Sequence, residues 1–144
     1  MSVLRIPSLK LVVVGLGVYF LVIGSVCMLM PQPMAEQFSI STIEVHGLST
    51  VRGDLGGLFL GLAIMSFLGV KRPMMLYAAS ILLGAIALGR VFGFILDGVT
   101  YFTVMLCVVE VILAGIFIGL AIRTQVSLNG TATKSAPNES TESQ

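Results

Sequence analysis

The chain has 144 residues, of which 56% are hydrophobic and only 10% are charged, and its net charge is +1. Soluble domains carry about 25% charged residues, so this composition excludes a water-soluble domain. The near-neutral charge argues against nucleic acid as a partner, because nucleic-acid-binding domains carry clustered basic residues. The apolar residues fall in long blocks, as membrane-spanning helices require. The lipid bilayer is therefore the expected surrounding of the chain.

The first apolar block, residues 11–30, contains no charged residue. About 20 residues at 1.5 Å each cross a hydrocarbon core of about 30 Å, so this block predicts a membrane-spanning helix. A secretory signal peptide is the alternative, but its apolar region is normally only about 7–15 residues and ends at a small-residue cleavage site. Here Pro31 and Pro33 follow the block and end the helix. Residues 34–52 are expected to form a loop that lies on the bilayer or packs over the helix ends.

Three further spans are predicted at residues 53–70, 74–94 and 101–122, separated by a basic turn at 71–73 and by the turn signal Asp97-Gly98. Glycines spaced by four residues allow helices to approach closely in lipid. The predicted helix-packing glycines are Gly53, Gly57, Gly61, Gly89, Gly93, Gly115 and Gly119. The polar tail, residues 124–144, is predicted to be disordered.

These elements predict an all-α fold in which residues 1–123 form a four-transmembrane-helix bundle. Four spans place both termini on one side of the membrane. The short loops on that side hold most of the Lys and Arg residues, and the positive-inside rule then predicts cytoplasmic termini. The sequence shows no metalloprotease, serine-hydrolase or phosphate-binding-loop motif. It therefore predicts a protein that is not an enzyme and that uses no metal or cofactor.

Five ionisable residues lie within or beside the predicted spans: Arg52, Asp54, Arg90, Asp97 and Glu110. A charge in hydrocarbon costs at least about 2.5–3.5 kcal/mol, so each needs a partner, a wet cavity or a function. A structural ion pair of Glu110 with Arg90 or Arg52 is one interpretation, and Arg90 turned outward to Asp97 is another. A polar cavity that opens outward and binds a small molecule, a lipid head group or a proton is the third. A protonated, neutral Glu110 is the fourth.

Three stretches resemble a known family. They read V-R-G-D-L-G-G-L-F-L-G-L at 51–62, G-R-V-F-G-F-I-L-D-G at 89–98 and V-V-E-V-I-L-A-G at 108–115. Together they resemble, over residues 10–122, the bacterial DUF4345 family of small four-helix membrane proteins, which is broadly similar to DoxX-type proteins. The family pattern is matched by Arg52, Gly56, Gly57, Gly89, Arg90, Gly93, Asp97, Gly98 and Glu110, whereas Leu55 stands where the family often has tyrosine. The resemblance implies a four-helix fold in a bacterial inner membrane and no particular activity.

The leading functional hypothesis is a small, non-enzymatic membrane binding or accessory protein. It acts alone or in an assembly with a second copy or another membrane protein. The alternative is a small-solute or proton-coupled transporter, which would work as an oligomer because four short helices make a small transporter protomer. A membrane redox or lipid-modifying enzyme is a third class. A cavity around Glu110 favours binding or transport, whereas a dry Arg90–Glu110 pair favours a structural role.

Overall fold

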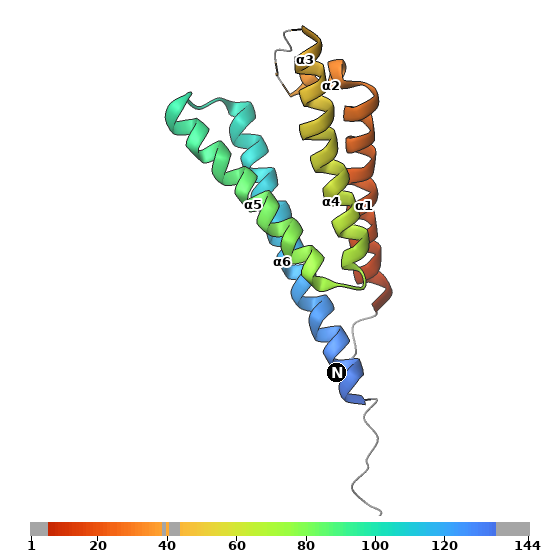
Figure 1. Ribbon diagram of the computed structural model, residues 1–144. Helices are drawn as coiled ribbons and strands as arrows, with labels where there is room; N and C mark the ends of the chain where they lie inside the picture. Colours follow the sequence, from red (N-terminus) through yellow and green to blue (C-terminus); the bar gives the residue numbers. More distant parts are fainter. Residues whose placement is uncertain (1–5, 39, 41–43, 135–144) are drawn as a thin grey trace, which may run out of the picture.

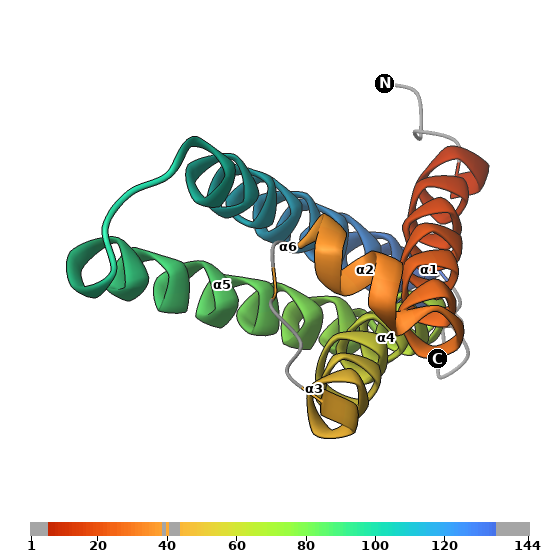
Figure 2. The same ribbon diagram turned by 90° about the horizontal axis from the view of Figure 1, so that it is seen from above.

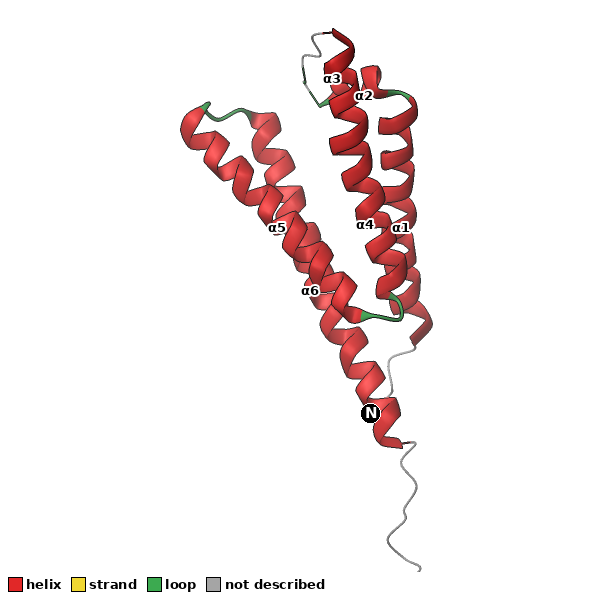
Figure 3. Ribbon diagram, viewed as in Figure 1, coloured by secondary structure: helices red, strands yellow, loops and turns green. Residues whose placement is uncertain are grey.

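Seven helical segments make up the described part of the computed structural model, which comprises residues 6–38, 40 and 44–134. They are α1 (Ile6–Leu29), α2 (Pro31–Gln37), α3 (Glu44–Thr50), the π-helical η1 (Val51–Gly56), α4 (Gly57–Gly69), α5 (Pro73–Leu96) and α6 (Tyr101–Lys134). Every regular element in these residues is a helix (Figure 3), which confirms the all-α prediction. Four stretches are long and apolar enough to cross a membrane: Leu9–Leu29, Gly47–Gly69, Pro73–Leu96 and Tyr101–Ser127.

The long helices form two antiparallel pairs, α1 with α4 and α5 with α6 (Figure 1). The pairs meet near the turn between α4 and α5, which we call the closed end, and they diverge toward the opposite, open end. The short helices α2 and α3 lie at the open end beside α1 and η1. Seen from above, α2 extends from the end of α1 across the space between the two pairs (Figure 2).

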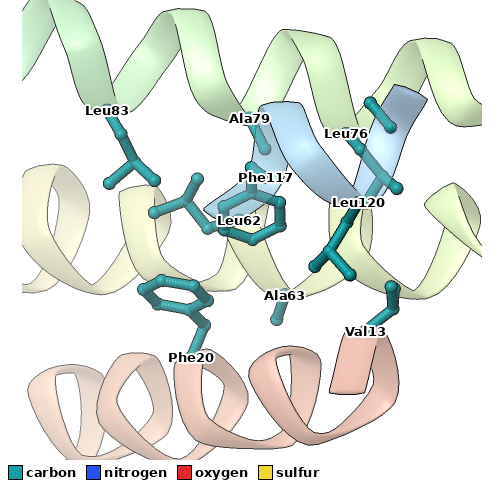
Figure 4. Close-up of a cluster of buried hydrophobic side chains, with 10 residues drawn as sticks. Val13, Phe20, Leu62, Ala63, Leu76, Ala79, Leu83, Phe117 and Leu120 are labelled. Atoms are coloured by element: carbon teal, nitrogen blue, oxygen red, sulfur yellow. The ribbon is translucent and has the colours of Figure 1, made fainter. Parts of the chain in front are cut away.

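A buried hydrophobic core joins the two pairs in the half of the bundle nearer the closed end (Figure 4). All four long helices contribute to it: Val13 and Phe20 from α1, Leu62 and Ala63 from α4, Leu76, Ala79 and Leu83 from α5, and Phe117, Leu120 and Ala121 from α6. The rings of Phe20 and Phe117 stack across the pairs, with centroids 6.1 Å apart. In lipid, such close packing rather than exclusion of water holds helices together.

Local chemistry sets the ends of the helices. Pro31 begins α2 and Pro73 begins α5, and proline suits the first turn of a helix because it needs no N–H donor there. In the connection between α5 and α6, Gly98 has a positive φ of 93°, a conformation that glycine adopts without strain. Thr100 caps α6, since its Oγ1 accepts a hydrogen bond from Thr103 N–H at 3.3 Å. These signals explain why α5 and α6 begin close to their predicted starts.

The loop predicted over residues 34–52 is largely helical. α2 occupies its beginning, and a continuous helical stretch starts at Glu44 and runs through η1 into α4. The predicted start of this span at residue 53 was therefore too late. Extending an existing helix fixes fewer dihedral angles per hydrogen bond than starting a new one. The helix that forms in the apolar span therefore extends toward the N-terminus, through η1 and α3.

The tail predicted to be disordered from residue 124 is also helical in its first part, because α6 continues to Lys134. Thr124 is buried and its Oγ1 donates to Leu120 O at 2.8 Å, while Tyr77 on α5 donates to Gln125 Oε1 at 3.4 Å. The Thr124 bond lies within α6, and the bond between Tyr77 and Gln125 holds the beginning of the extension against α5. Residues 135–144 of the predicted tail lie outside the described residues.

The close helix contacts use other glycines than those predicted. In the described part of the chain, a Cβ on the predicted glycines would meet no atom of another helix within 4 Å: Gly53, Gly57, Gly61, Gly89, Gly93, Gly115 and Gly119. These glycines therefore do not mark the close contacts between helices of this chain, and their role in helix packing stays a prediction. Instead, α1 approaches the η1–α4 segment at Gly24, whose Cβ would lie 2.9 Å from Leu60 N and 3.1 Å from Gly56 O. Successive helical residues point about 100° apart, so glycine spacing does not reveal which face turns inward.

Candidate functional site

Arg90 on α5 and Glu110 on α6 form the one ion pair among the described residues. Arg90 Nε donates to Glu110 Oε1 at 2.7 Å, and the two side chains are 29% and 13% exposed. At 1.5 Å per residue, Arg90 lies about 9 Å from the end of α5 and Glu110 about 13 Å from the start of α6. Both groups therefore lie well inside apolar spans, where the bond spares each an unpaired charge.

Two further bonds fix the register of the α5–α6 hairpin around this pair. Ser80 Oγ donates to Ala114 O at 2.9 Å, and Cys107 Sγ contacts Ala87 O at 3.8 Å. The Ser80–Ala114 bond lies nearer the closed end than the ion pair, whereas the Cys107–Ala87 contact lies at the level of the pair, because Ala87 precedes Arg90 on α5 and Cys107 precedes Glu110 on α6. Together with the short connection at residues 97–100, they hold the two charged side chains opposite each other.

A crevice of about 270 Å³ lies between the two helix pairs and includes both charged residues in its wall. Apart from the hydroxyl of Tyr19, the rest of the wall is apolar, and it comes from every long helix. It includes Ile23 on α1, Leu58 and Phe59 on α4, Ile86 on α5, and Leu106 and Leu113 on α6. Phe20, Leu62 and Leu83 belong to both the crevice and the hydrophobic core. The core therefore forms the floor of the crevice on the side of the closed end.

A row of aromatic rings runs from the segment after α2 down to this floor. Phe38 stacks on Phe59 with centroids 6.3 Å apart, and Phe59 stacks on Phe20 at 6.2 Å. Ile40, close to Phe38 in the chain, also lines the crevice. The segment that follows α2 thus covers the crevice from the open end, and its two apolar side chains complete the wall.

The crevice reaches the outer surface of the bundle. Three residues that line it are also substantially exposed: Tyr19 on α1 at 52%, Val109 on α6 at 42%, and Ile40 at 41%. In a membrane, the exposed faces of α1 and α6 at this level meet lipid chains, so the rim that these residues form is accessible from the hydrocarbon.

The ion pair leaves one strong acceptor unused. Glu110 Oε2 is buried and has no hydrogen-bond partner among the described residues. A carboxylate accepts hydrogen bonds at both oxygens, and a buried acceptor without a donor costs about 1–3 kcal/mol or more when charged. The site therefore gains stability from any donor group that reaches this oxygen.

The other predicted members of the charge cluster do not join the pair. Arg52 and Asp54 are exposed on η1, and Asp97 is exposed after the end of α5. Within the described residues, no ion pair links them to Arg90 or Glu110. The two helix pairs diverge at the open end (Figure 1), which separates Arg52 and Asp54 on η1 from the ion pair. Asp97 follows the end of α5, seven residues or about 10 Å beyond Arg90 on the same helix axis. Of the five predicted residues, only Arg90 and Glu110 form an ion pair in the described structure.

Most of the crevice wall was not predicted from the sequence. Phe38 and Ile40 fall in the stretch 34–52 that was expected to form a loop, Phe59 falls in a predicted span, and no sequence motif singles out any of the three. Their common role depends on how the two helix pairs diverge, which leaves no periodic signal in the sequence. Among the described residues, no three His, Cys, Asp or Glu side chains gather as metal ligands would.

The comparisons with known proteins fit the architecture. A family profile described as "Domain of unknown function (DUF4345)" matches residues 8–121. Comparisons with curated proteins and with solved structures give no significant match. The family match includes η1, the whole of α5 and the ion-paired part of α6, and it agrees with the resemblance seen in the sequence. Because the match covers well over half of the chain, this multi-pass membrane protein belongs to the DUF4345 family.

Proposed function

We propose that this protein binds a small, lipid-soluble molecule in the crevice between its two helix pairs and does not transform it. The observation that carries the proposal is the crevice itself, an apolar space with one charged pair in its wall. Ligand sites combine a mostly apolar lining with a few placed polar groups that fix orientation. Ionisable residues inside membrane spans are also functional candidates by default.

The volume limits the size of the ligand. An engineered cavity of about 150 Å³ in another protein holds benzene, and drug-sized ligands occupy about 300–1,000 Å³. The crevice has about 270 Å³, which suits a molecule larger than one aromatic ring and smaller than a phospholipid. A whole membrane lipid is therefore excluded as the enclosed ligand.

The transporter alternative gains no support from this arrangement. A transport path would have to continue from the crevice past Phe20, Leu62 and Phe117, which are all fully buried in the core. We therefore favour binding or an accessory role over transport.

The distribution of basic residues predicts how the bundle is oriented in the membrane. Lys71 and Arg72 are exposed in the turn at the closed end, and Lys10 is exposed near the start of α1 at the same end. The positive-inside rule places this end in the cytoplasm. The crevice then lies in the half of a bacterial inner membrane nearer the outer surface.

The absence of tryptophan from the chain makes a direct test simple. Phe59→Trp places a single fluorophore in the crevice wall, and Phe92→Trp, at a position that is 66% exposed on α5, is the matched control. Both variants are reconstituted in lipid nanodiscs and titrated with para-bromobiphenyl, whose heavy atom quenches tryptophan. We expect saturable quenching for Phe59→Trp and only linear quenching by probe dissolved in lipid for Phe92→Trp. Linear quenching in both variants would refute the proposal.

A further inference from the structure

We infer that the crevice selects an electrically neutral molecule with an apolar body and one hydroxyl group, which donates a hydrogen bond to Glu110. This inference rests on the proposed binding function and adds the chemical class of the ligand. It depends on the charge of the crevice wall, on the unused oxygen of Glu110 and on the apolar rim.

The charge of the wall favours a neutral ligand. Arg90 and Glu110 are the only charged residues among those that line the crevice, and their formal charges cancel. A carboxylate ligand would compete with Glu110 for Arg90 and leave a second negative charge among apolar side chains. An ammonium ligand would compete with Arg90 in the same way. Either outcome leaves an unpaired charge in a site of low dielectric, which is strongly unfavourable.

The unused oxygen requires a donor. Oε1 of Glu110 already accepts from Arg90 Nε, and Oε2 has no partner in the described structure. A ketone, an ester or an ether has only acceptor atoms and leaves this oxygen unsatisfied, whereas a hydroxyl donates. The last torsion of a glutamate side chain is broad, so the carboxylate can turn Oε2 toward a donor in the crevice. The same hydroxyl can accept from a guanidinium N–H of Arg90 that the ion pair leaves unused.

The body of the ligand must be apolar for two reasons. Apart from the hydroxyl of Tyr19 at the rim, the rest of the wall is aliphatic or aromatic, with rings stacked from Phe38 to Phe20. The rim at Tyr19 and Val109 is accessible from the hydrocarbon, so a molecule dissolved in the bilayer reaches the site without crossing water. A polar sugar or amino acid does not match the apolar wall and does not dissolve in the hydrocarbon from which the site is reached.

The test compares two probes, para-benzylphenol and its methyl ether para-benzylanisole, in which a methyl group replaces the hydroxyl hydrogen and so removes the hydrogen-bond donor. Each is used to displace para-bromobiphenyl from the Phe59→Trp protein in nanodiscs, and concentrations are corrected for partition into lipid. A hydrogen bond to a charged acceptor corresponds to about a tenfold to hundredfold change in affinity. We expect the phenol to displace the quencher at a concentration at least about tenfold lower than the ether. Equal displacement would overturn the inference while leaving the binding function standing.

Glu110→Gln identifies the acceptor. When the amide oxygen of Gln takes the bond from Arg90 Nε, the amide NH₂ stands where Oε2 was, so a donor replaces the acceptor. The preference for the phenol should then fall to about onefold or reverse. The double variant Arg90→Gln/Glu110→Gln, which leaves no unpaired charge, should also lose the preference. If the single variant folds poorly, the double variant provides the test in its place. An undiminished preference in either variant would show that Glu110 is not the acceptor.

If para-bromobiphenyl quenching never saturates in the Phe59→Trp protein, the binding function itself fails, and this inference fails with it. The quencher has no hydroxyl, so its saturation tests the crevice alone. The two probe molecules test the polar contact alone, and the failures are therefore distinguishable.

Discussion

Removing either Arg90 or Glu110 should destabilise the bundle strongly. Removing both charges together should cost less stability than the sum of the two single losses. Glu110→Gln leaves the Arg90 guanidinium without its carboxylate, and Arg90→Gln leaves the carboxylate with both oxygens unpaired. Removing one partner of a buried pair costs about 3–5 kcal/mol. Arg90 is 29% exposed and can partly turn toward the membrane surface, so we place each single variant near the lower end, at about 3 kcal/mol.

The double variant keeps an interhelical contact without charge. Two glutamine amides can hydrogen-bond across α5 and α6, and such bonds contribute only about 0.6 kcal/mol on average in membranes. No charge is left buried, however, so the double variant should lose no more than either single one. The coupling free energy of the cycle is then about 3 kcal/mol, at the upper end of the usual range for residues in contact.

The cycle is measured as the free energy of reversible unfolding in mixed micelles, with helix content followed by circular dichroism as the denaturing detergent fraction rises. Arg72→Gln and Glu36→Gln are matched controls, because both positions are exposed outside the core of the bundle. They should change stability by less than about 0.5 kcal/mol. If the losses of the two single variants simply add in the double variant, the pair does not stabilise the hairpin and our reasoning is wrong.

Four other outcomes are expected. Gly24→Ala should lower the free energy of unfolding by about 1–3 kcal/mol because its Cβ would lie 2.9 Å from the backbone nitrogen of Leu60. Gly57→Ala, with open space around its Cβ, should be neutral or slightly stabilising in the same micelle assay, and equal losses in both would contradict the assigned contact face. Gly98→Ala should cost about 1–2 kcal/mol because φ is 93° there, and an unchanged midpoint would show that this turn is not strained by a side chain. An alkaline phosphatase fusion after Lys134 should be inactive, whereas an active fusion would reverse the proposed orientation.

Much of the fold follows from physical constraints that are visible in the sequence. The bilayer requires long apolar helices, so α5 begins and ends near its predicted limits and α6 begins at its predicted start, although α6 continues to Lys134. Their short connection makes them antiparallel neighbours, and this brings Arg90 and Glu110 together, as one of the sequence interpretations proposed. The pairing was predictable because two charges in lipid at similar depth on adjacent helices satisfy each other most easily.

Other features depend on the angle between the helix pairs, which no local pattern encodes. Arg52 lies on η1 in the other helix pair, and the divergence of the two pairs keeps it away from Arg90 and Glu110. The glycine at the close contact with α1 is Gly56 rather than Gly57, and one residue along a helix turns the contact by about 100°. The aromatic row through Phe38 and Phe59 arises from the same packing. Such contacts are determined by three-dimensional fit and are visible only in the structure.

The 20-residue separation between the members of the ion pair also bears on biosynthesis. Arg90 leaves the ribosome well before Glu110, so α5 first meets the translocon with an uncompensated charge. Releasing α5 into lipid alone would cost about 2.5–3.5 kcal/mol for that arginine. Retaining α5 until α6 has emerged removes this cost, because the two helices then enter the membrane with the charges already joined. The sequence order of the pair thus favours insertion of α5 and α6 as a single hairpin.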